Sequence, residues 1–239
     1  MSDLRAPGRL GLTIVAAGAF LLLAGVAQAA SFDCKKAATA IEQLICGDPE
    51  LDAFDSQLDG AYRGALDRSA DPAAVKERQL TWIKKRNACA DAACLLTAYK
   101  RQIPLLTAIS DPPPICVNAV NTIEGNACEA EKSRRADREL TRYVAAARKR
   151  LTAEAAGEFA EPSAKAALAQ LDASQTAWEA YRKAECSAVH TWFSTGTIRG
   201  IMHEDCWRSV TQARTVTVWT NWLQHLDDTP PLMPEPAVR

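Results

Sequence analysis

The sequence predicts an all-α protein made of two related helical units, each a hairpin or small bundle, that are stapled by disulfides. Three observations support this prediction. Apolar residues recur at helical spacing over most of the chain. Eight cysteines follow an export signal. A Gln-x2-Trp-x3-Arg pattern followed by cysteine occurs at residues 79–89 and, with one extra residue before the cysteine, again at residues 175–186.

Residues 1–29 predict a cleaved signal peptide. Two arginines precede an apolar run from Leu10 to Ala24, and Ala27-Gln-Ala29 provides a small-x-small cleavage site. The run is short for a membrane span, so an uncleaved anchor is the less favoured alternative. The first cysteine, Cys34, follows Ser-Phe-Asp and lacks the small-residue run of a bacterial lipobox. We therefore expect a periplasmic or secreted protein that is not attached to the membrane after cleavage.

The charge balance bears on the partners of the protein. The chain has 28 basic and 29 acidic residues and a formal net charge of −1. A nucleic-acid partner would require a basic stripe. We therefore expect no nucleic-acid partner, whereas a basic protein partner is neither required nor excluded.

The first unit is expected at residues 30–110. Asp48-Pro49 and Asp71-Pro72 each place a capping aspartate before a proline at the first helical position. An apolar stripe from Leu51 to Ala65 follows the first of these starts at helical spacing. The sequence therefore predicts a helix at each aspartate-proline pair and a third helix that begins at Cys94.

The second unit is expected at residues 116–226, after a stiff proline-rich linker at residues 111–115. It repeats the plan of the first unit with longer connections. Its predicted helices cover residues 127–151, 163–188 and 204–226, with a break at 157–162 and a glycine-containing loop at 190–203. The tail at residues 227–239 is rich in proline, so it predicts a disordered segment.

The two units share a register. Both begin with cysteines that are twelve residues apart, and both continue with the same residue types at the same or nearly the same offsets. An internal duplication explains this agreement. The matched pairs are Cys34 and Cys116, Cys46 and Cys128, Asp55 and Asp137, Leu58 and Leu140, and, within one turn, Tyr62 and Tyr143.

An even number of cysteines in an exported chain predicts disulfides, and eight cysteines allow 105 pairings. The repeat suggests pairs within each unit. Crossed pairing inside a unit, such as Cys34 with Cys94, is the main alternative. The suggested pairs are Cys34–Cys46, Cys89–Cys94, Cys116–Cys128 and Cys186–Cys206.

A metal site is the sharpest alternative to the last of these pairs. Cys186, His190, His203 and Cys206 together have a spacing that suits zinc. Zinc–thiolate sites are uncommon where thiols are oxidised, and the first unit has matching cysteines but no histidine. We therefore favour the disulfide and expect no metal or other cofactor.

The repeated pattern places Gln79, Trp82 and Arg86 on one helical face, and its second copy does the same. Each trio is either a binding face or part of the scaffold, with the tryptophan in the core and the polar groups paired. Because both copies need the same packing, the scaffold is the favoured interpretation. The residues of the second copy are Gln175, Trp178 and Arg182.

No Ser-His-Asp or Cys-His pattern stands out, and no pair of carboxylates is singled out for hydrolysis. The sequence therefore predicts a protein that is not an enzyme.

The arrangement of both units resembles the LprI-like family of small exported lysozyme inhibitors. The resemblance covers nearly the whole mature chain, although the lipidation cysteine of a lipoprotein is missing. The residues that carry it in the first unit are Cys34, Cys46, Leu51, Asp55, Gln79, Trp82, Arg86, Cys89, Cys94, Leu95, Tyr99 and Arg101. Those in the second unit are Gln175, Trp178, Arg182, Cys186, the run Thr195-Gly-Thr-Ile198, Cys206, Thr211 and Arg214.

The resemblance implies that the protein binds and inhibits lysozyme or another cell-wall hydrolase. Because the shared residues are scaffold residues, it transfers no inhibitory residue. The segment that differs most between the units is the loop after Cys186, and Trp192, Phe193 and Gly196 are its candidate contact residues. The alternatives are a structural or stress-related envelope protein and, less favoured, a zinc-dependent envelope hydrolase.

Overall fold

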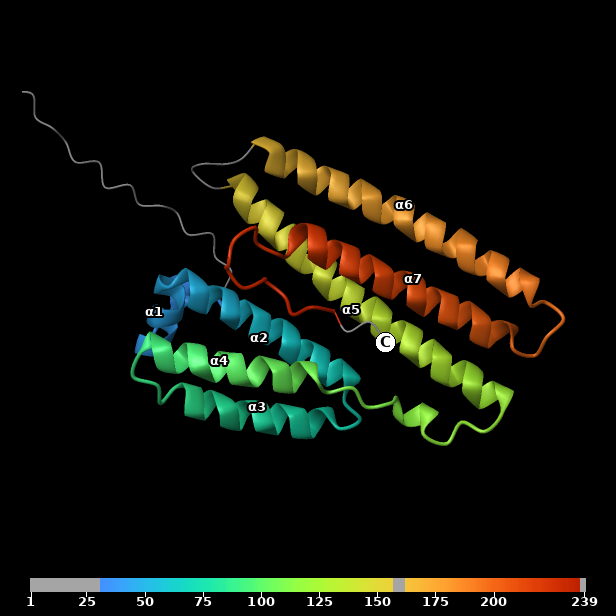
Figure 1. Ribbon diagram of the computed structural model, residues 1–239, viewed down its shortest axis with the longest axis horizontal. Helices are drawn as coiled ribbons and strands as arrows, with labels where there is room; N and C mark the ends of the chain where they lie inside the picture. Colours follow the sequence, from blue (N-terminus) through green and yellow to red (C-terminus); the bar gives the residue numbers. More distant parts are fainter. Residues whose placement is uncertain (1–30, 157–161, 237–239) are drawn as a thin grey trace, which may run out of the picture.

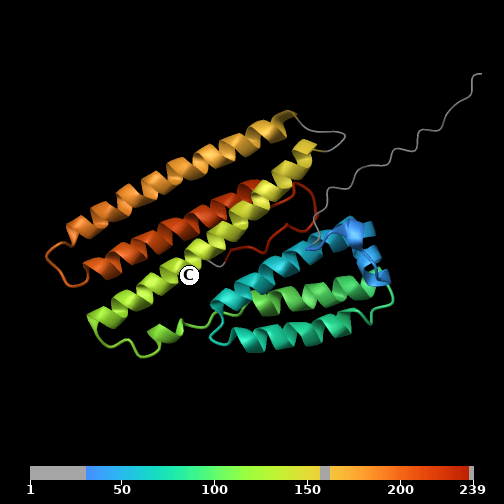
Figure 2. The same cartoon turned by 180° about the vertical axis from the view of Figure 1, so that it is seen from behind.

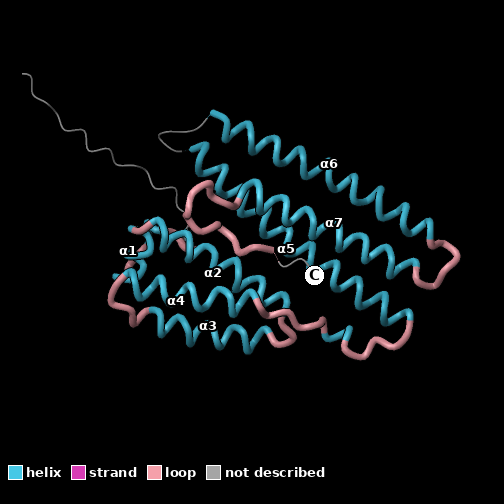
Figure 3. Tube along the Cα trace, in the orientation of Figure 1, coloured by secondary structure: helices cyan, strands magenta, loops and turns pink. Residues whose placement is uncertain are grey.

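The computed structural model describes residues 31–156 and 162–236. Within these ranges the chain forms α-helices and two short 3-10 helices, and no strand is present (Figure 3). The all-α prediction is therefore confirmed. The predicted signal peptide, and residues 157–161 of the predicted break, lie outside the described residues.

The helices form two bundles that lie side by side (Figures 1 and 2). Helix α2 of the first bundle contacts α5 of the second. The first bundle contains η1 (Cys34–Lys36), α1 (Ala40–Gly47), α2 (Pro49–Arg68), α3 (Pro72–Arg86) and α4 (Ala92–Thr107). The second contains η2 (Pro114–Cys116), α5 (Thr122–Ala156), α6 (Pro162–Trp192) and α7 (Arg199–Trp222).

Side-chain caps fix where the first-bundle helices begin. The Asp48 carboxylate accepts hydrogen bonds from the backbone N–H groups of Glu50 and Leu51, and Asp71 accepts one from Ala74. A proline at the first helical position follows each cap and loses no hydrogen bond there. The predicted starts of α2 and α3 are therefore confirmed.

Helix α5 combines what the first unit divides between α1 and α2. Counted from Cys46 and Cys128, the positions of Asp48 and Pro49 are taken by Ala130 and Glu131. Both replacements favour a continuous helix, whereas the aspartate-proline pair ends one helix and begins the next. As a result α5 is 35 residues long and extends beyond both predicted ends.

Each bundle has its own apolar core. In the first, Ile45, Leu51 and Leu95 are fully buried among α1, α2 and α4. In the second, Leu171 and Val218 are fully buried between α6 and α7 and pack against α5. The predicted apolar stripe of α2 faces the first core.

The C-terminal segment differs from its predicted disorder. Residues 227–236, which we call the strap, turn at the end of α7 and run back between α2 and α5 (Figure 1). The backbone N–H of Leu232 donates to Leu223, and Met233 is 6% exposed. Composition predicts disorder from the prolines, but the apolar pair Leu232-Met233 supplies an anchor that outweighs them.

Among the described residues, no helix combines the length and the apolar character needed to cross a bilayer.

Candidate functional site

All eight cysteines lie within the described residues and form four disulfides. The pairs are those that the repeat suggested, not the crossed alternative. The bond between Cys186 and Cys206 removes both thiolates that the zinc alternative required. The rings of His190 and His203 lie 5.9 Å apart, and no cluster of three metal-ligating side chains occurs in the described part of the chain.

The first Gln-Trp-Arg trio belongs to a polar network between helices. The hydroxyl of Tyr99 on α4 donates to Asp55 on α2 at 2.7 Å, and Arg86 on α3 donates to both, each at 3.3 Å. The Asp55 side chain is only 2% exposed. Burial raises the pKa of the Tyr99 hydroxyl, so Tyr99 keeps the proton that it donates. Trp82 packs against the Tyr99 ring with centroids 5.7 Å apart.

The second trio builds the corresponding network. Arg182 on α6 donates to Asp137 on α5 and, at 2.7 Å, to Thr211 on α7. Thr211 and Tyr99 occupy the same position, five residues after the last cysteine of their units. The Arg182 guanidinium lies between two tryptophan rings, 4.4 Å from the centroid of Trp178 and 3.9 Å from that of Trp207. Such cation–π contacts add to the attraction of the ion pair.

The glutamine of each trio binds a residue eight positions after the last cysteine of its unit. Gln102 donates to Gln79 at 2.9 Å, and Arg214 donates to Gln175 at 3.3 Å. Each trio therefore contacts the helix that follows it as well as the helix that precedes it. In this arrangement the repeated pattern joins three helices in each unit, and its polar groups are used inside the protein.

Two residues that the sequence did not single out complete these networks. The backbone N–H and hydroxyl of Ser31 both donate to the second carboxylate oxygen of Asp55, at 3.1 and 2.6 Å. In the second unit the indole N–H of Trp207 donates to the second oxygen of Asp137 at 3.1 Å. The matched offsets of the two aspartates were a usable signal, whereas nothing in the pattern identified Ser31.

The predicted contact segment is shorter than expected. Helix α6 continues to Trp192, and only residues 193–198 form the turn before α7. The glycine at position 200 predicted a loop, but it lies in α7, where an added Cβ would come within 2.5 Å of the Asn126 side chain. This glycine therefore permits close packing of α7 on α5.

The candidate contact residues differ in exposure. Trp192 is 83% exposed at the end of α6, whereas Phe193 is half-buried. The backbone N–H of Gly196 donates to Phe193 at 2.9 Å and closes the turn. Trp192 is thus a large apolar side chain that the rest of the protein leaves in solvent.

The start of α5 lies at the same end of the second bundle as the turn between α6 and α7 (Figures 1 and 2), and it carries more exposed apolar side chains. Val120 and Ile123 are 87% and 81% exposed where α5 begins. An added Cβ at Gly125 would lie 3.1 Å from Ile201, which shows that the starts of α5 and α7 are packed together. We call this surface the apolar end, and its residues are Ile115, Val117, Val120, Ile123, Trp192 and Ile198.

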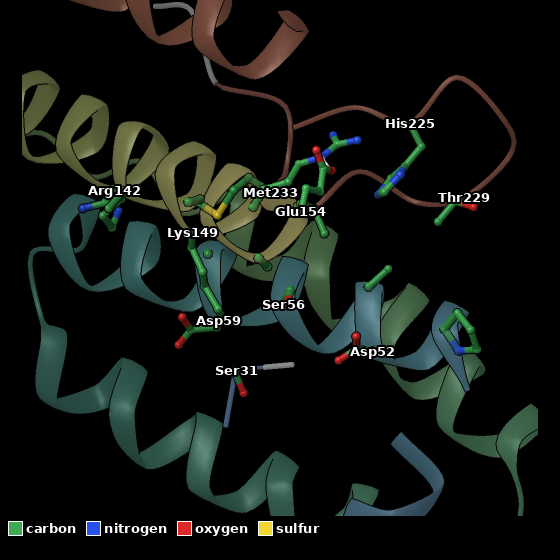
Figure 4. A pocket seen from close by; sticks show the side chains of 18 of the residues that line it. Ser31, Asp52, Ser56, Asp59, Arg142, Lys149, Glu154, His225, Thr229 and Met233 are labelled. Carbon is green, nitrogen blue, oxygen red and sulfur yellow. Dashed lines mark hydrogen bonds and ion pairs between the residues drawn. The ribbon is translucent and has the colours of Figure 1, made fainter. Parts of the chain in front are cut away.

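A cavity of about 450 Å³ lies between the bundles, where α2 faces α5. Figure 4 shows Ser56 and Asp59 of α2 on one side and Lys149 extending toward them from α5. The side chain of Met233 borders the cavity, so the strap forms part of its wall. Small residues of both helices line the cavity, among them Gly60 and Ala146.

A known family matches the sequence of both bundles. The family described as "Lysozyme inhibitor LprI" matches the chain over residues 34–105 and 116–217. The chain belongs to the LprI family. Because the two matched segments are the two bundles, the chain carries two tandem LprI units.

Relatives named "Lipoprotein LprI" occur in Mycobacterium tuberculosis and Mycobacterium bovis. Each is 36% identical to this LprI chain over 103 residues. The match covers 40% of this chain and 51% of each relative, so the chain spans about half the length of these curated relatives. No solved structure matches the chain.

Proposed function

We propose that the protein is an exported inhibitor of lysozyme-type peptidoglycan hydrolases and that it acts by binding. Membership of the LprI family is the observation that carries this proposal. An inhibitor needs a rigid surface and no catalytic group. Four disulfides and two polar networks between helices supply that rigidity.

We place the contact with the hydrolase at the apolar end. Exposed apolar patches mark interaction sites, and tryptophan is enriched among residues that dominate binding energy. Trp192 projects from a helix whose end is linked to α7 by the Cys186–Cys206 disulfide. The turn is therefore presented on a fixed support, which lowers the entropic cost of binding.

Four disulfides suit a protein that works outside the cytoplasm. Membership of a lysozyme-inhibitor family suits the same location. We extend this to a periplasmic or secreted location, reached by cleavage of residues 1–29. The partner would then be a cell-wall hydrolase that meets the protein in the same compartment.

Lysis of peptidoglycan by lysozymes of several classes, with and without the oxidised mature chain, tests the function. We expect slower lysis and a stable complex with at least one class. Wild-type protein that neither inhibits nor binds any lysozyme would contradict the proposal and favour a structural role in the envelope.

A matched pair of substitutions tests the contact surface. Trp192→Ala should weaken inhibition by about tenfold or more, as truncation of a central aromatic anchor does. Leu80→Ala is the control, because Leu80 is a 52% exposed apolar residue on α3 in the other bundle. Equal effects of both substitutions, or none from Trp192→Ala, would reject the apolar end while leaving lysozyme inhibition in place.

A further inference from the structure

A second cavity, of about 470 Å³, lies where the two units meet. Its walls are the end of α2, the linker at residues 111–113, the middle of α5 and one turn of α7. Five basic and three acidic side chains line it, so its charge is unlike that of the nearly balanced chain. The basic residues are Arg68, Lys132, Arg135, Arg142 and Arg208.

The acidic side chains at this cavity are already engaged. Asp111 accepts hydrogen bonds from the backbone N–H of Ala70 and from the Ser69 hydroxyl. Glu139 pairs with Arg68 at 3.5 Å, and burial raises the pKa of the Glu139 carboxyl. Asp67 pairs with Arg142, and Lys132 and Arg208 pair with Glu129 and Asp205. Of the five basic side chains, Arg135 therefore has no ion pair among the described residues.

Two guanidinium groups at the cavity have unused donors. The Nε–H groups of Arg135 and Arg142 are buried, and neither has an acceptor among the described residues. A buried donor without an acceptor is costly, and buried polar groups in proteins are nearly always paired. The two unused donors therefore indicate a missing hydrogen-bond acceptor.

The backbone holds Arg135 in this position. Its Nη1 atom donates to the carbonyl of Asp111 at 2.8 Å and to that of Arg68 at 3.4 Å. Burial lowers the pKa of Arg135, so its charged form lacks some of the stabilisation that water would provide. An anion in the cavity would restore that stabilisation.

We propose that this cavity binds a tetrahedral oxyanion of the phosphate or sulfate class, with Arg135 and Arg142 as hydrogen-bond donors. Arginine suits such a ligand because its planar guanidinium presents several N–H groups to the oxygens of one anion. The volume leaves room for a free anion with water or for a phosphate group that belongs to a larger molecule.

The anion would connect the two units. Arg68 and residues 111–113 come from the first unit and the linker, whereas Arg135 and Arg142 come from α5. A ligand held by both sides favours the arrangement in which they are adjacent and stabilises it by mass action. This role is independent of the apolar end and of lysozyme.

Titration calorimetry of the oxidised mature chain with inorganic phosphate and sulfate in the millimolar range tests the proposal, with chloride as the reference anion. We expect saturable binding at one site that weakens as ionic strength rises. Vesicles that contain phosphatidylglycerol identify the source of the phosphate, since vesicle binding that depends on Arg135 would indicate a lipid headgroup. If phosphate, sulfate and the vesicles all fail to bind saturably, the proposal is overturned.

Substitutions at two neighbouring positions distinguish anion binding in the cavity from a general effect of net charge. Arg135→Gln should weaken anion binding by about tenfold or more, the effect of losing a charged hydrogen bond. Arg134→Gln removes the same charge one residue away, from a side chain that is 59% exposed and paired with Glu131. Equal weakening by both would show that only net charge matters and would reject the site.

A third variant covers the case in which Arg135→Gln fails to fold. Gln212 on α7 lines the same cavity, and Gln212→Glu adds a negative charge with almost no change in shape. We expect it to reduce anion binding at least as strongly as Arg135→Gln while the chain keeps its helical circular dichroism. Unchanged affinity in a folded Gln212→Glu variant would contradict the proposal.

Discussion

Asp55 and Asp137 occupy the same position of the two units, yet their surroundings differ. Both accept a hydrogen bond from the arginine of their trio. The Asp55 side chain is 2% exposed, whereas that of Asp137 is 40% exposed. Loss of a partner from a buried ion pair leaves an uncompensated charge, whereas water can replace an exposed partner.

Asp55→Ala should therefore destabilise the protein by about 3 to 5 kcal/mol, because water does not reach the place of this buried carboxylate and Arg86 and Tyr99 both lose their acceptor there. Arg182 is as buried as Arg86, but the Asp137 carboxylate is 40% exposed. Asp137→Ala should cost about 1 kcal/mol, because water can take the place of that carboxylate beside Arg182. Equilibrium unfolding in urea measures both. Similar losses in the two variants would show that solvent exposure does not decide the strength of these networks.

For single residues, the sequence predicted which side chains share a helical face but not which groups they bind. The spacing of Gln79, Trp82 and Arg86 is local, and a helix fixes their common direction. Their partners Asp55 and Tyr99 come from other helices, and the pairing depends on how those helices pack. The sequence predicted that the polar groups of the trio are paired, and only the fold selected their partners.

The starts of α2 and α3 were predictable, whereas other helix boundaries were less so. The aspartate-proline pairs determine where α2 and α3 begin, because capping and proline geometry act within a few residues. The end of α6 and the start of α7 depend on contacts between helices, such as the packing of Gly200 on Asn126. The predicted loop at 190–203 was therefore too long.

The strap is the segment for which the prediction from composition differs most from the structure. Its prolines indicated disorder, yet side-chain donors on two helices bind its carbonyls. The Tyr143 hydroxyl donates to Pro234 at 2.7 Å and the Trp219 indole donates to Met233 at 2.8 Å. Prediction of this segment required knowing that these two side chains face the same groove.

Met233→Ala should cost about 2 kcal/mol or more, because it removes a buried side chain and leaves a cavity. The matched control is Leu226→Ala, which shortens a fully exposed side chain just before the strap and should change stability little. Thermal unfolding measures the difference. A Met233→Ala variant as stable as the control would show that the strap is not anchored in solution.

In the whole molecule, the disulfides contribute unequally to the free energy of unfolding. In the chain-entropy description a bridge stabilises more when it closes a longer loop. Cys186 and Cys206 are 20 residues apart, whereas Cys89 and Cys94 are five residues apart. The two bridges occupy the same position of their units, so the units provide an internal comparison.

Replacement of Cys186 and Cys206 by serine should lower the free energy of unfolding by about 3 kcal/mol. The same replacement of Cys89 and Cys94 should cost about 1 kcal/mol less, because the loop is shorter. Denaturant unfolding of the two double variants under oxidising conditions gives the values. A larger loss for the shorter loop would contradict the loop-length argument.

The duplication, the all-α class and the pairing of cysteines followed from the sequence, because each depends on repeated spacing within one unit. The contacts between the units did not, since no pattern links the two sides of that junction. Asp67 illustrates this, because it accepts hydrogen bonds from Arg138 and Arg142 of the other unit. The same holds for both cavities at the junction.

Every disulfide joins cysteines of one unit, at most 20 residues apart. The order in which the cysteines occur along the chain therefore matches the order in which the bridges can close. The first unit can complete both of its bridges before Cys116 is available, because each of its cysteines has its partner within the same unit. Oxidation can proceed from the N-terminus onward as the chain enters an oxidising compartment, and pairing errors between the units are limited by timing as well as by structure.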